Sequence, residues 1–150
     1  MNMTNQQLEQ YLHQHIPMSA VMQVTVNSVT EKTLTLQAPL APNINHQQTV
    51  FGGSASTLAI LSAWSLLHTR LAKEGIACRL VIQRNEMAYL KPMTEDFTAT
   101  ATLVDERDWQ RFLNMLRRKG KARINVAAEL YTGKLLAGTF SGEYVALTGT

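Results

Sequence analysis

The most constraining feature of the sequence is a helical stretch from about Ser54 to Lys73 that is apolar on almost every side. Large apolar residues are spread all around it: Leu58, Ile60, Leu61, Trp64, Leu66, Leu67 and Leu71. A helix without a clean polar face is buried on most sides. The rest of the chain must therefore supply a layer that surrounds this helix.

Segments with a two-residue alternation predict that this layer is a β-sheet. The alternation occurs in residues 21–28, 33–38, 79–90 and 97–104, and in two long segments within 121–147 around the turn at 132–133. A polar turn at 30–32 joins the first two segments, and residues 91–93 join the next two. Six strands connected mostly by hairpins can curl around one helix. The sequence therefore predicts an α+β fold with an antiparallel six-stranded sheet wrapped around a long central helix.

Two further helices are predicted outside the central one. Residues 6–15 carry apolar side chains at helical spacing, with Asn5 as the expected cap and Pro17 as the expected stop. Residues 105–120 form an amphipathic helix, with Asp105 or Asp108 as its cap. Its apolar face is made by Trp109, Phe112, Leu113 and Leu116. We expect this face to cover a sheet edge or the mouth of a binding site.

Composition favours one soluble domain over residues 1–150, with 45% hydrophobic and 17% charged residues. The apolar window Leu58–Leu67 is interrupted by serines and is too short to span a bilayer. The N-terminus lacks a signal-peptide pattern, so we expect a cytoplasmic protein that has no membrane partner. Cys78 is the single cysteine, which excludes an internal disulfide and multi-cysteine zinc motifs, and no metal site is predicted.

The positive charge is concentrated late in the chain. Seven of the 14 basic residues lie between Arg107 and Arg123, and five of them fall in the run RRKGKAR at 117–123. Such a cluster attracts phosphate groups or an acidic protein. The alternative is a solvated helix end, where cations are favourable beside the helix dipole. Nucleic-acid binding is disfavoured, because no aromatic residues are interleaved with the run.

Three segments of the chain resemble the hotdog-fold acyl thioesterases. Their loop commonly reads Asn-x-x-Gly-x-x-His-Gly-Gly before the central helix, and NHQQTVFGG at 45–53 matches in spacing. Residues 87–92 are similar to the Tyr-Leu-Arg-Pro strand end of that family, and 120–121 followed by two long strands look like its closing hairpin. More narrowly, residues 49–54, 109–119 and 118–123 look like the thioesterase domain at the C-terminus of YiiD-type proteins.

This resemblance implies a hotdog fold with one extra amphipathic helix, and an acyl thioesterase that needs no cofactor. The implied substrates are thioesters of coenzyme A or of an acyl carrier protein. Hotdog subunits pair their sheets and share sites, so a homodimer or a dimer of dimers is expected. A dehydratase is disfavoured, because its catalytic His paired with an acidic residue has no clear match.

The loop and the helix start supply the candidate catalytic residues. Thioester hydrolysis requires water to attack a carbonyl whose oxyanion is held by positioned N–H donors. Gly52 and Gly53 lack β-carbons, so a carbonyl can approach the N–H groups of the first helical turn closely. Asn45 is expected to orient water or polarise the carbonyl, and His46 is the leading general base. Further candidates for substrate contact are Phe51, Ser54, Ser56, Thr57, Tyr89, Arg117, Arg118, Lys119 and Lys121.

Several departures from the family pattern keep alternatives open. Phe51 replaces the usual His, Gln48 replaces the Gly, and Ile60 stands where many members carry the catalytic acid. No Asp or Glu occurs between Glu31 and Glu74, so a base must come from elsewhere. The alternative function is a non-catalytic domain that binds acyl-coenzyme A or acyl carrier protein. Each candidate also has a structural alternative of its own: Asn45 only caps its loop, His46 is exposed and idle, and the two glycines serve packing.

Overall fold

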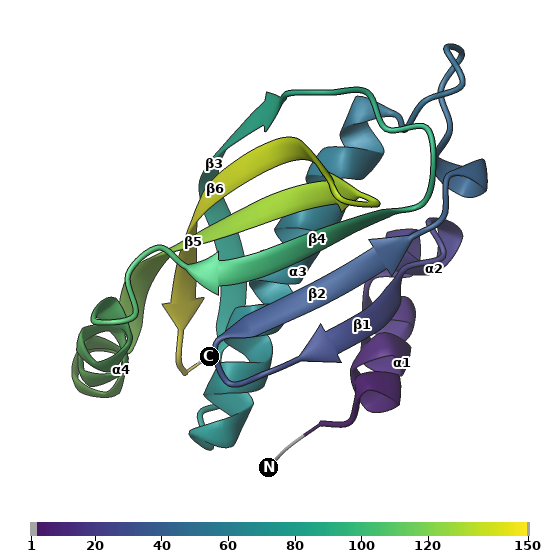
Figure 1. Cartoon of the computed structure of the whole chain (residues 1–150). Helices are drawn as coiled ribbons and strands as arrows, with labels where there is room; N and C mark the ends of the chain where they lie inside the picture. Colours follow the sequence, from purple (N-terminus) through teal and green to yellow (C-terminus); the bar gives the residue numbers. More distant parts are fainter. Residues whose placement is uncertain (1–2, 150) are drawn as a thin grey trace.

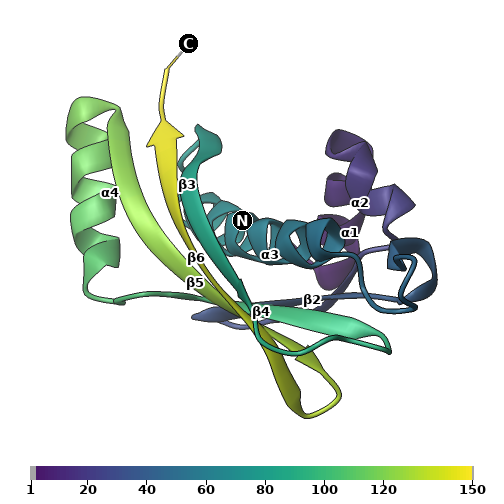
Figure 2. The same ribbon diagram turned by 90° about the horizontal axis from the view of Figure 1, so that it is seen from above.

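A computed structural model describes residues 3–149 of the chain. A curved six-stranded antiparallel sheet holds one long helix, α3 (Gly52–Lys73), in its concave face (Figures 1 and 2). The strands are β1 (Thr25–Val29), β2 (Thr33–Ala38), β3 (Arg79–Tyr89), β4 (Phe97–Leu103), β5 (Lys121–Thr132) and β6 (Leu135–Leu147). The other helices are α1 (Asn5–His15), α2 (Pro17–Val21), a 3-10 turn η1 (Ala41–Asn43) and α4 (Asp108–Lys119). The predicted fold class is confirmed.

The central helix is buried as its sequence requires. Eleven of its residues are buried, from Ala55 to Leu71, and the sheet covers them on one side while α1 packs nearby. Tyr144 of β6 is fully buried, and its hydroxyl donates a 2.7 Å hydrogen bond to the carbonyl oxygen of Ile60 in α3. Burial raises the pKa of the Tyr144 phenol well above its usual range. The helix and the sheet therefore share one core.

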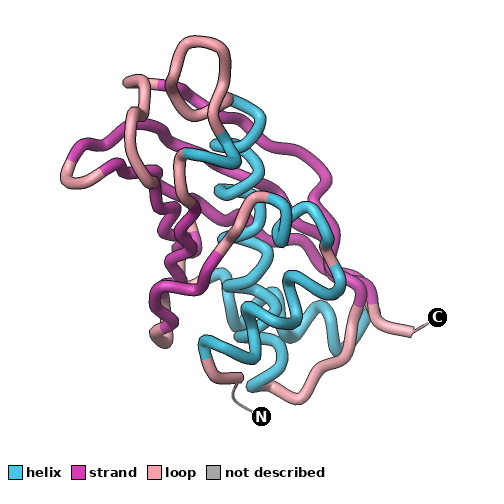
Figure 3. Tube along the Cα trace, turned by 90° about the vertical axis from the view of Figure 1, so that its right-hand side faces the viewer, coloured by secondary structure: helices cyan, strands magenta, loops and turns pink. Residues whose placement is uncertain are grey.

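The order of strands in the sheet is β1-β2-β4-β5-β6-β3, which differs from the predicted series of hairpins. β3 and β4 follow each other in sequence but do not pair. β3 pairs with β6 at the edge of the sheet, and β4 lies between β2 and β5. Residues 90–96 therefore cross the end of the sheet instead of forming a tight turn. This crossover brings the end of β3 close to the start of α3 (Figure 3).

Several helix and strand ends differ from their predicted positions for local reasons. Thr4, and not Asn5, caps α1, because its hydroxyl accepts from the Gln7 N–H while the Gln7 side chain accepts from the Thr4 N–H. The predicted stop at Pro17 is confirmed, since α1 ends at His15, and Pro17 then begins the separate helix α2, where its missing N–H costs nothing. β1 starts at Thr25 because α2 occupies the residues before it. In α4, neither predicted Asp is the cap: residue 107 precedes the helix without a side-chain bond.

A stack of aromatic rings attaches α1 to α3. The Tyr11 ring lies 4.2 Å from His15 and 4.8 Å from His68, and the His68 ring lies 4.6 Å from Trp64 (centroid distances). The Trp64 indole also donates to the carbonyl oxygen of Leu80 in β3. Burial, and secondarily the neighbouring His15, lower the pKa of His68 below its usual value.

We expect this stack to make stability depend on pH. Because the folded protein disfavours protonated His68, the unfolded chain takes up the proton first as the pH falls below about 6.5. The contribution of neutral His68 to the free energy of unfolding is complete above about pH 6.5, and it is lost as the pH falls through the lower pKa of the folded state. Between neutral and mildly acidic pH, the free energy of unfolding measured with denaturant should therefore fall less in His68→Phe than in the wild type. An equal loss in both proteins would assign the pH dependence to other groups.

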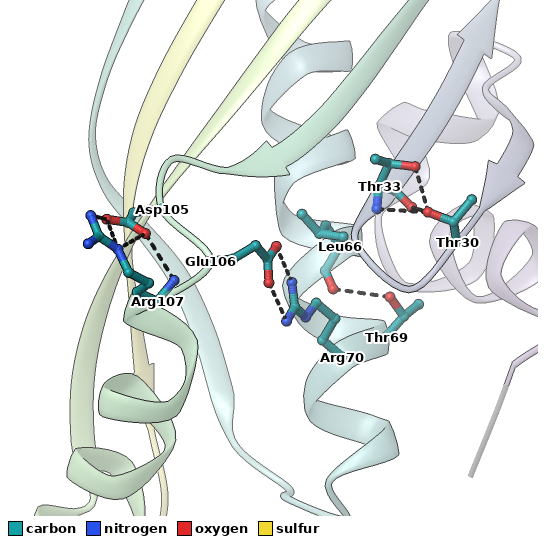
Figure 4. A network of polar contacts seen from close by, with 8 residues as sticks. All are labelled: Thr30, Thr33, Leu66, Thr69, Arg70, Asp105, Glu106 and Arg107. Carbon is teal, nitrogen blue, oxygen red and sulfur yellow. Dashed lines mark hydrogen bonds and ion pairs between the residues drawn. The ribbon is translucent and has the colours of Figure 1, made fainter.

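The amphipathic helix α4 is attached to the C-terminal half of α3. Arg70 donates two hydrogen bonds to the Glu106 carboxylate, at 2.8 and 3.0 Å (Figure 4). Its guanidinium also lies 4.3 Å from the Trp109 ring centroid. Arg117 of α4 also contacts Glu74 at 3.3 Å. The predicted apolar face is confirmed, since Phe112, Leu113 and Leu116 are buried. Helix α4 thus lies beside β5 at the end of the molecule where α3 finishes.

Two neighbouring arginine pairs should differ sharply in their effect on stability. The Arg70 side chain is 12% exposed, whereas Arg107, which pairs with Asp105, is 87% exposed. We expect Arg70→Met to lower the free energy of unfolding by about 1–3 kcal/mol, because the mostly buried bidentate contact and the ring contact are both lost. Arg107→Met should leave it unchanged, because water screens that pair. Urea unfolding of the two variants tests the contrast.

Candidate active site at the start of the central helix

A cleft of about 290 Å³ lies where α3 begins. One wall is formed by the start of α3, a second by the end of β3 and the segment after it, and a third by the β5–β6 hairpin. Apolar side chains dominate its lining, including Val50, Ala55, Met87, Met93 and Leu130. Lys91 is the one charged residue among the lining residues that the structure describes. The cleft is suited to an apolar chain with a polar end.

The first turn of α3 provides unpaired hydrogen-bond donors. The preceding residue, Phe51, has no side chain that can cap the helix, and the first helical bond runs from the Ala55 N–H to the Phe51 carbonyl. Within residues 3–149, the N–H groups of Gly52, Gly53 and Ser54 therefore have no protein acceptor. These donors lie at the positive end of a 22-residue helix. The arrangement can bind an oxyanion.

Backbone hydrogen bonds hold the walls of the cleft together. The Val50 N–H donates to the Met93 carbonyl at 2.9 Å, and the Leu90 N–H donates to the Ala137 carbonyl at 2.9 Å. The Tyr89 hydroxyl donates to the Gly52 carbonyl at 3.1 Å, which joins the end of β3 directly to the start of α3. The site is thus built from segments that are far apart in the sequence.

Asn45 organises the loop before the helix. Its side-chain oxygen accepts from the Gln47 N–H at 2.9 Å and the Thr49 N–H at 3.1 Å, and its amide donates to the Thr49 hydroxyl at 3.0 Å. Gln48 has a φ of 66°, a left-handed conformation that favours glycine. Residue 48, where the family pattern has Gly, therefore keeps the left-handed backbone conformation for which Gly is favoured. In this subunit, Asn45 acts on its own loop.

The remaining loop and helix candidates surround the cleft without lining it. His46 is exposed on the loop, and the half-exposed Phe51 ring covers Gly53 so closely that an added β-carbon would lie 2.4 Å from it. The Ser56 hydroxyl donates to the Gly53 carbonyl at 3.1 Å, whereas Ser54 and Thr57 are half-buried. Of the predicted site residues, Gly52 and Tyr89 are the two that line the cleft.

Comparison with known proteins identifies the family. The family model described as "Putative thioesterase (yiiD_Cterm)" matches residues 5–148, nearly the whole chain. The chain belongs to this thioesterase family. The resemblance seen in the loop, the β3 end and the closing hairpin is therefore confirmed, and the chain is a member of a thioesterase family with the hotdog fold.

Solved structures of similar proteins agree with this family. A protein of unknown function from Chlorobaculum tepidum is 32% identical, with a TM-score of 0.91 over 97% of this chain and 94% of that one. A putative thioesterase from Shewanella oneidensis is 30% identical, with a TM-score of 0.87 over 96% of this chain and 97% of that one. A thioesterase from Haemophilus influenzae, 13% identical with a TM-score of 0.80 over 99% and 93% of the two chains, shares the fold.

The predicted phosphate contacts of this thioesterase lie far from the cleft in one subunit. Arg117, Arg118, Lys119 and Lys121 lie at the end of α4 and the start of β5. Because Arg117 contacts Glu74, just beyond the C-terminal end of α3, this cluster is separated from Gly52 by the length of that helix, about 33 Å. Figure 1 shows α4 and the loop before α3 at opposite ends of the molecule. One subunit does not bring these two groups of residues together.

Residues 3–149 contain neither a metal-binding cluster nor a membrane-spanning helix. No group of three or more His, Cys, Asp or Glu side chains is placed to hold a metal ion. No helix in this range is long and apolar enough to cross a membrane.

Several lining residues of the thioesterase cleft were missed by sequence reasoning. Lys91 and Pro92 belong to the segment 87–92 that carries the resemblance but were not predicted as site residues, and Met93 directly follows that segment. Ala137 and Gly138 come from β6 and reach the cleft only because β6 pairs with β3. No local pattern marks such residues.

Proposed function

We propose that the protein hydrolyses acyl thioesters of coenzyme A or of an acyl carrier protein. In this proposal the acyl chain occupies the apolar cleft, and its carbonyl oxygen points at the N–H groups of Gly52, Gly53 and Ser54. The observation that carries the proposal is the start of α3, whose donors lack a capping side chain and open beside an apolar cleft. The expected compartment is the cytoplasm, where Cys78 stays a free thiol.

The chemistry assigns the central task to the helix start. Water attacks the thioester carbon and loses a proton, and negative charge develops on the former carbonyl oxygen. The three N–H groups and the helix dipole stabilise that charge. When the tetrahedral intermediate collapses, the carbon–sulfur bond breaks, and the products are a carboxylic acid and a thiol. Tyr89 holds the Gly52 peptide through its hydrogen bond and so positions the donors.

The general base of the proposed reaction is His46. The cleft lining within residues 3–149 includes neither a carboxylate nor an imidazole, so the base must approach from outside it. His46 is on the loop that leads into α3 and is exposed to solvent. His46→Ala should reduce kcat by about 10²–10⁴-fold if it accepts the water proton. Retained turnover would transfer the role to a carboxylate of a second copy.

We also propose that two copies pair through β3. This strand is 11 residues long, lies at the sheet edge and exposes Val81 and Tyr89. A long exposed edge strand is a ready template for pairing. Such a dimer would place the cleft of one copy beside the other, and dimers can pair further. Light scattering after size-exclusion chromatography should give a mass of at least twice 16.7 kDa.

The second candidate function is binding of an acyl thioester without hydrolysis. It is favoured because no carboxylate lines the cleft within the described residues 3–149. The deciding experiment is steady-state thiol release from a panel of acyl-coenzyme A thioesters, from acetyl to palmitoyl. Turnover that rises with enzyme concentration supports hydrolysis. Binding heat in calorimetry without turnover across the panel supports the binding domain. Neither turnover nor binding would contradict both functions.

A further inference from the structure

A groove of about 750 Å³ lies between α4 and the first half of β5, remote from the thioester cleft. Helix α4 supplies one wall, with Phe112 and Met115 among its residues. The other wall consists of residues 121–125 of β5, all five of which line the groove. Since successive side chains of a strand point to opposite faces, a cavity lined by five consecutive residues runs along the edge of the strand.

This edge of β5 has no partner strand within residues 3–149. The first residue of β5 that pairs with β4 is Val126, which lies opposite Leu103. One further bond joins the Val104 N–H to the Asn125 carbonyl at 3.2 Å. Polar groups of a strand alternate between its two edges, so the N–H and C=O groups of Arg123 and Lys121 point to the same side as those of Asn125. They face the groove.

Hydrogen bonding on the other side of β5 supports this assignment. The Gly120 carbonyl accepts from the Thr148 N–H, which follows β6, at 2.9 Å. Residue 120 and the alternate residues after it therefore bond toward β6. The edge at 121 and 123 is thus left open, and an unpaired edge is a template for an added strand.

The charge of the groove is positive. Arg111, Lys119, Lys121 and Arg123 line it, against the two carboxylates of Asp108 and Glu143. Within residues 3–149, Lys119 and Lys121 form no ion pair. The Arg111–Asp108 contact is 3.8 Å long. Among the described residues, the Arg123 guanidinium donates to the neutral side chain of Gln83 and forms no ion pair. An acidic ligand complements this surface.

We propose that this groove binds an extended acidic segment of another protein, which adds to β5 as an antiparallel strand of about five residues, roughly 17 Å long. Alternation fixes the sequence pattern of this segment. Residues that face Lys121 and Arg123 are Asp or Glu, and the residues between them face Phe112 and Ile124 and are apolar. Helix-and-strand grooves of this form capture peptides through main-chain hydrogen bonds, with side chains adding specificity.

The geometry makes a specific prediction about the peptide backbone. In an antiparallel pair, the residue opposite Arg123 exchanges both hydrogen bonds with it and has its side chain on the same face. That residue is an acidic one in the proposed pattern. The N–H groups of the acidic residues therefore bond β5, and those of the apolar residues point away from it.

The probe is a fluorescein-labelled heptapeptide, acetyl-EVEVEVE-amide, titrated with the wild-type protein and followed by fluorescence anisotropy. We expect saturable binding that N-methylation of the Glu residues abolishes and N-methylation of the Val residues retains. Because both arms use the wild-type protein, folding of a variant does not enter. Absence of binding, or equal binding of the two methylated peptides, would overturn the proposal. The second result would indicate attraction of charge alone.

Variants test the charged wall. Lys121→Glu combined with Arg123→Glu should weaken peptide binding by tenfold or more, which corresponds to about 1.4 kcal/mol or more. Lys134→Glu combined with Arg107→Glu changes the net charge equally, outside the groove lining, and should bind as the wild type does. Equal loss in both double variants contradicts a docked strand. Displacement of the peptide by a more tightly bound single-stranded RNA octamer would also contradict the docked strand, because it would assign the groove to nucleic acid.

Discussion

Gly52→Pro should reduce kcat for acyl thioester hydrolysis by about 10²–10³-fold, the usual cost of removing one oxyanion donor. Proline removes the Gly52 N–H and little else. Position 52 is the first residue of α3, where proline is well tolerated, and Phe51 already has the extended conformation, φ −59° and ψ 133°, that a residue before proline requires. A β-carbon at 52 would lie 3.5 Å from the Tyr89 ring, an ordinary contact.

Gly52→Ala is the matched control for this substitution. It adds the same β-carbon but keeps the N–H group, so its kcat should stay near that of the wild type. Thermal unfolding of both variants checks that α3 is intact. If proline and alanine lower kcat equally, the Gly52 N–H takes no part in the reaction, and the donors of Gly53 and Ser54 must suffice.

The fold could be read from the sequence wherever the signal is local. The apolar periodicity of α3 and the two-residue alternation of β2, β5 and β6 lie within single segments, so their existence and nearly all of their residues were predicted correctly. The pairing of β3 with β6 joins residues 49 to 68 positions apart, and no local pattern encodes it. The predicted hairpin between β3 and β4 was wrong for this reason.

Helix ends were less predictable than helix interiors. The two glycines at 52–53 have low helix propensity, so the sequence placed the start of α3 at Ser54, although the structure begins the helix at Gly52. This difference matters for the site, because it places the N–H groups of both glycines in the first turn. Burial of the rest of α3 offsets their weak propensity.

The candidate site residues stay a prediction, because the resemblance supplied positions and not distances. Gly52 and Tyr89, which were predicted as separate candidates, lie 37 residues apart in the sequence and are joined by one hydrogen bond. The basic run at 117–123 could not be placed in the same way. Its position depends on how α4 docks, and the Arg70 and Arg117 contacts hold α4 at the far end of α3.

Ala55→Met should shift the substrate preference toward short acyl chains. Ala55 is 2% exposed and lines the cleft from the first turns of α3, so the longer side chain of Met would occupy space proposed for the acyl chain. Each buried methylene contributes about 0.8 kcal/mol, so loss of three should lower kcat/KM for a decanoyl thioester by about 50-fold. The flexible thioether limits strain in the surrounding core.

The acetyl thioester provides an internal control, because its two carbons do not reach far into the cleft. Its kcat/KM should change little in Ala55→Met, and Ile60→Met, on α3 but outside the cleft lining, should leave the whole series unchanged. A parallel fall for acetyl and decanoyl thioesters in Ala55→Met would mean that the substitution disturbs the N–H donors of the helix start. A fall for neither would place the acyl chain elsewhere, since the volume removed from this cleft would then be irrelevant to binding.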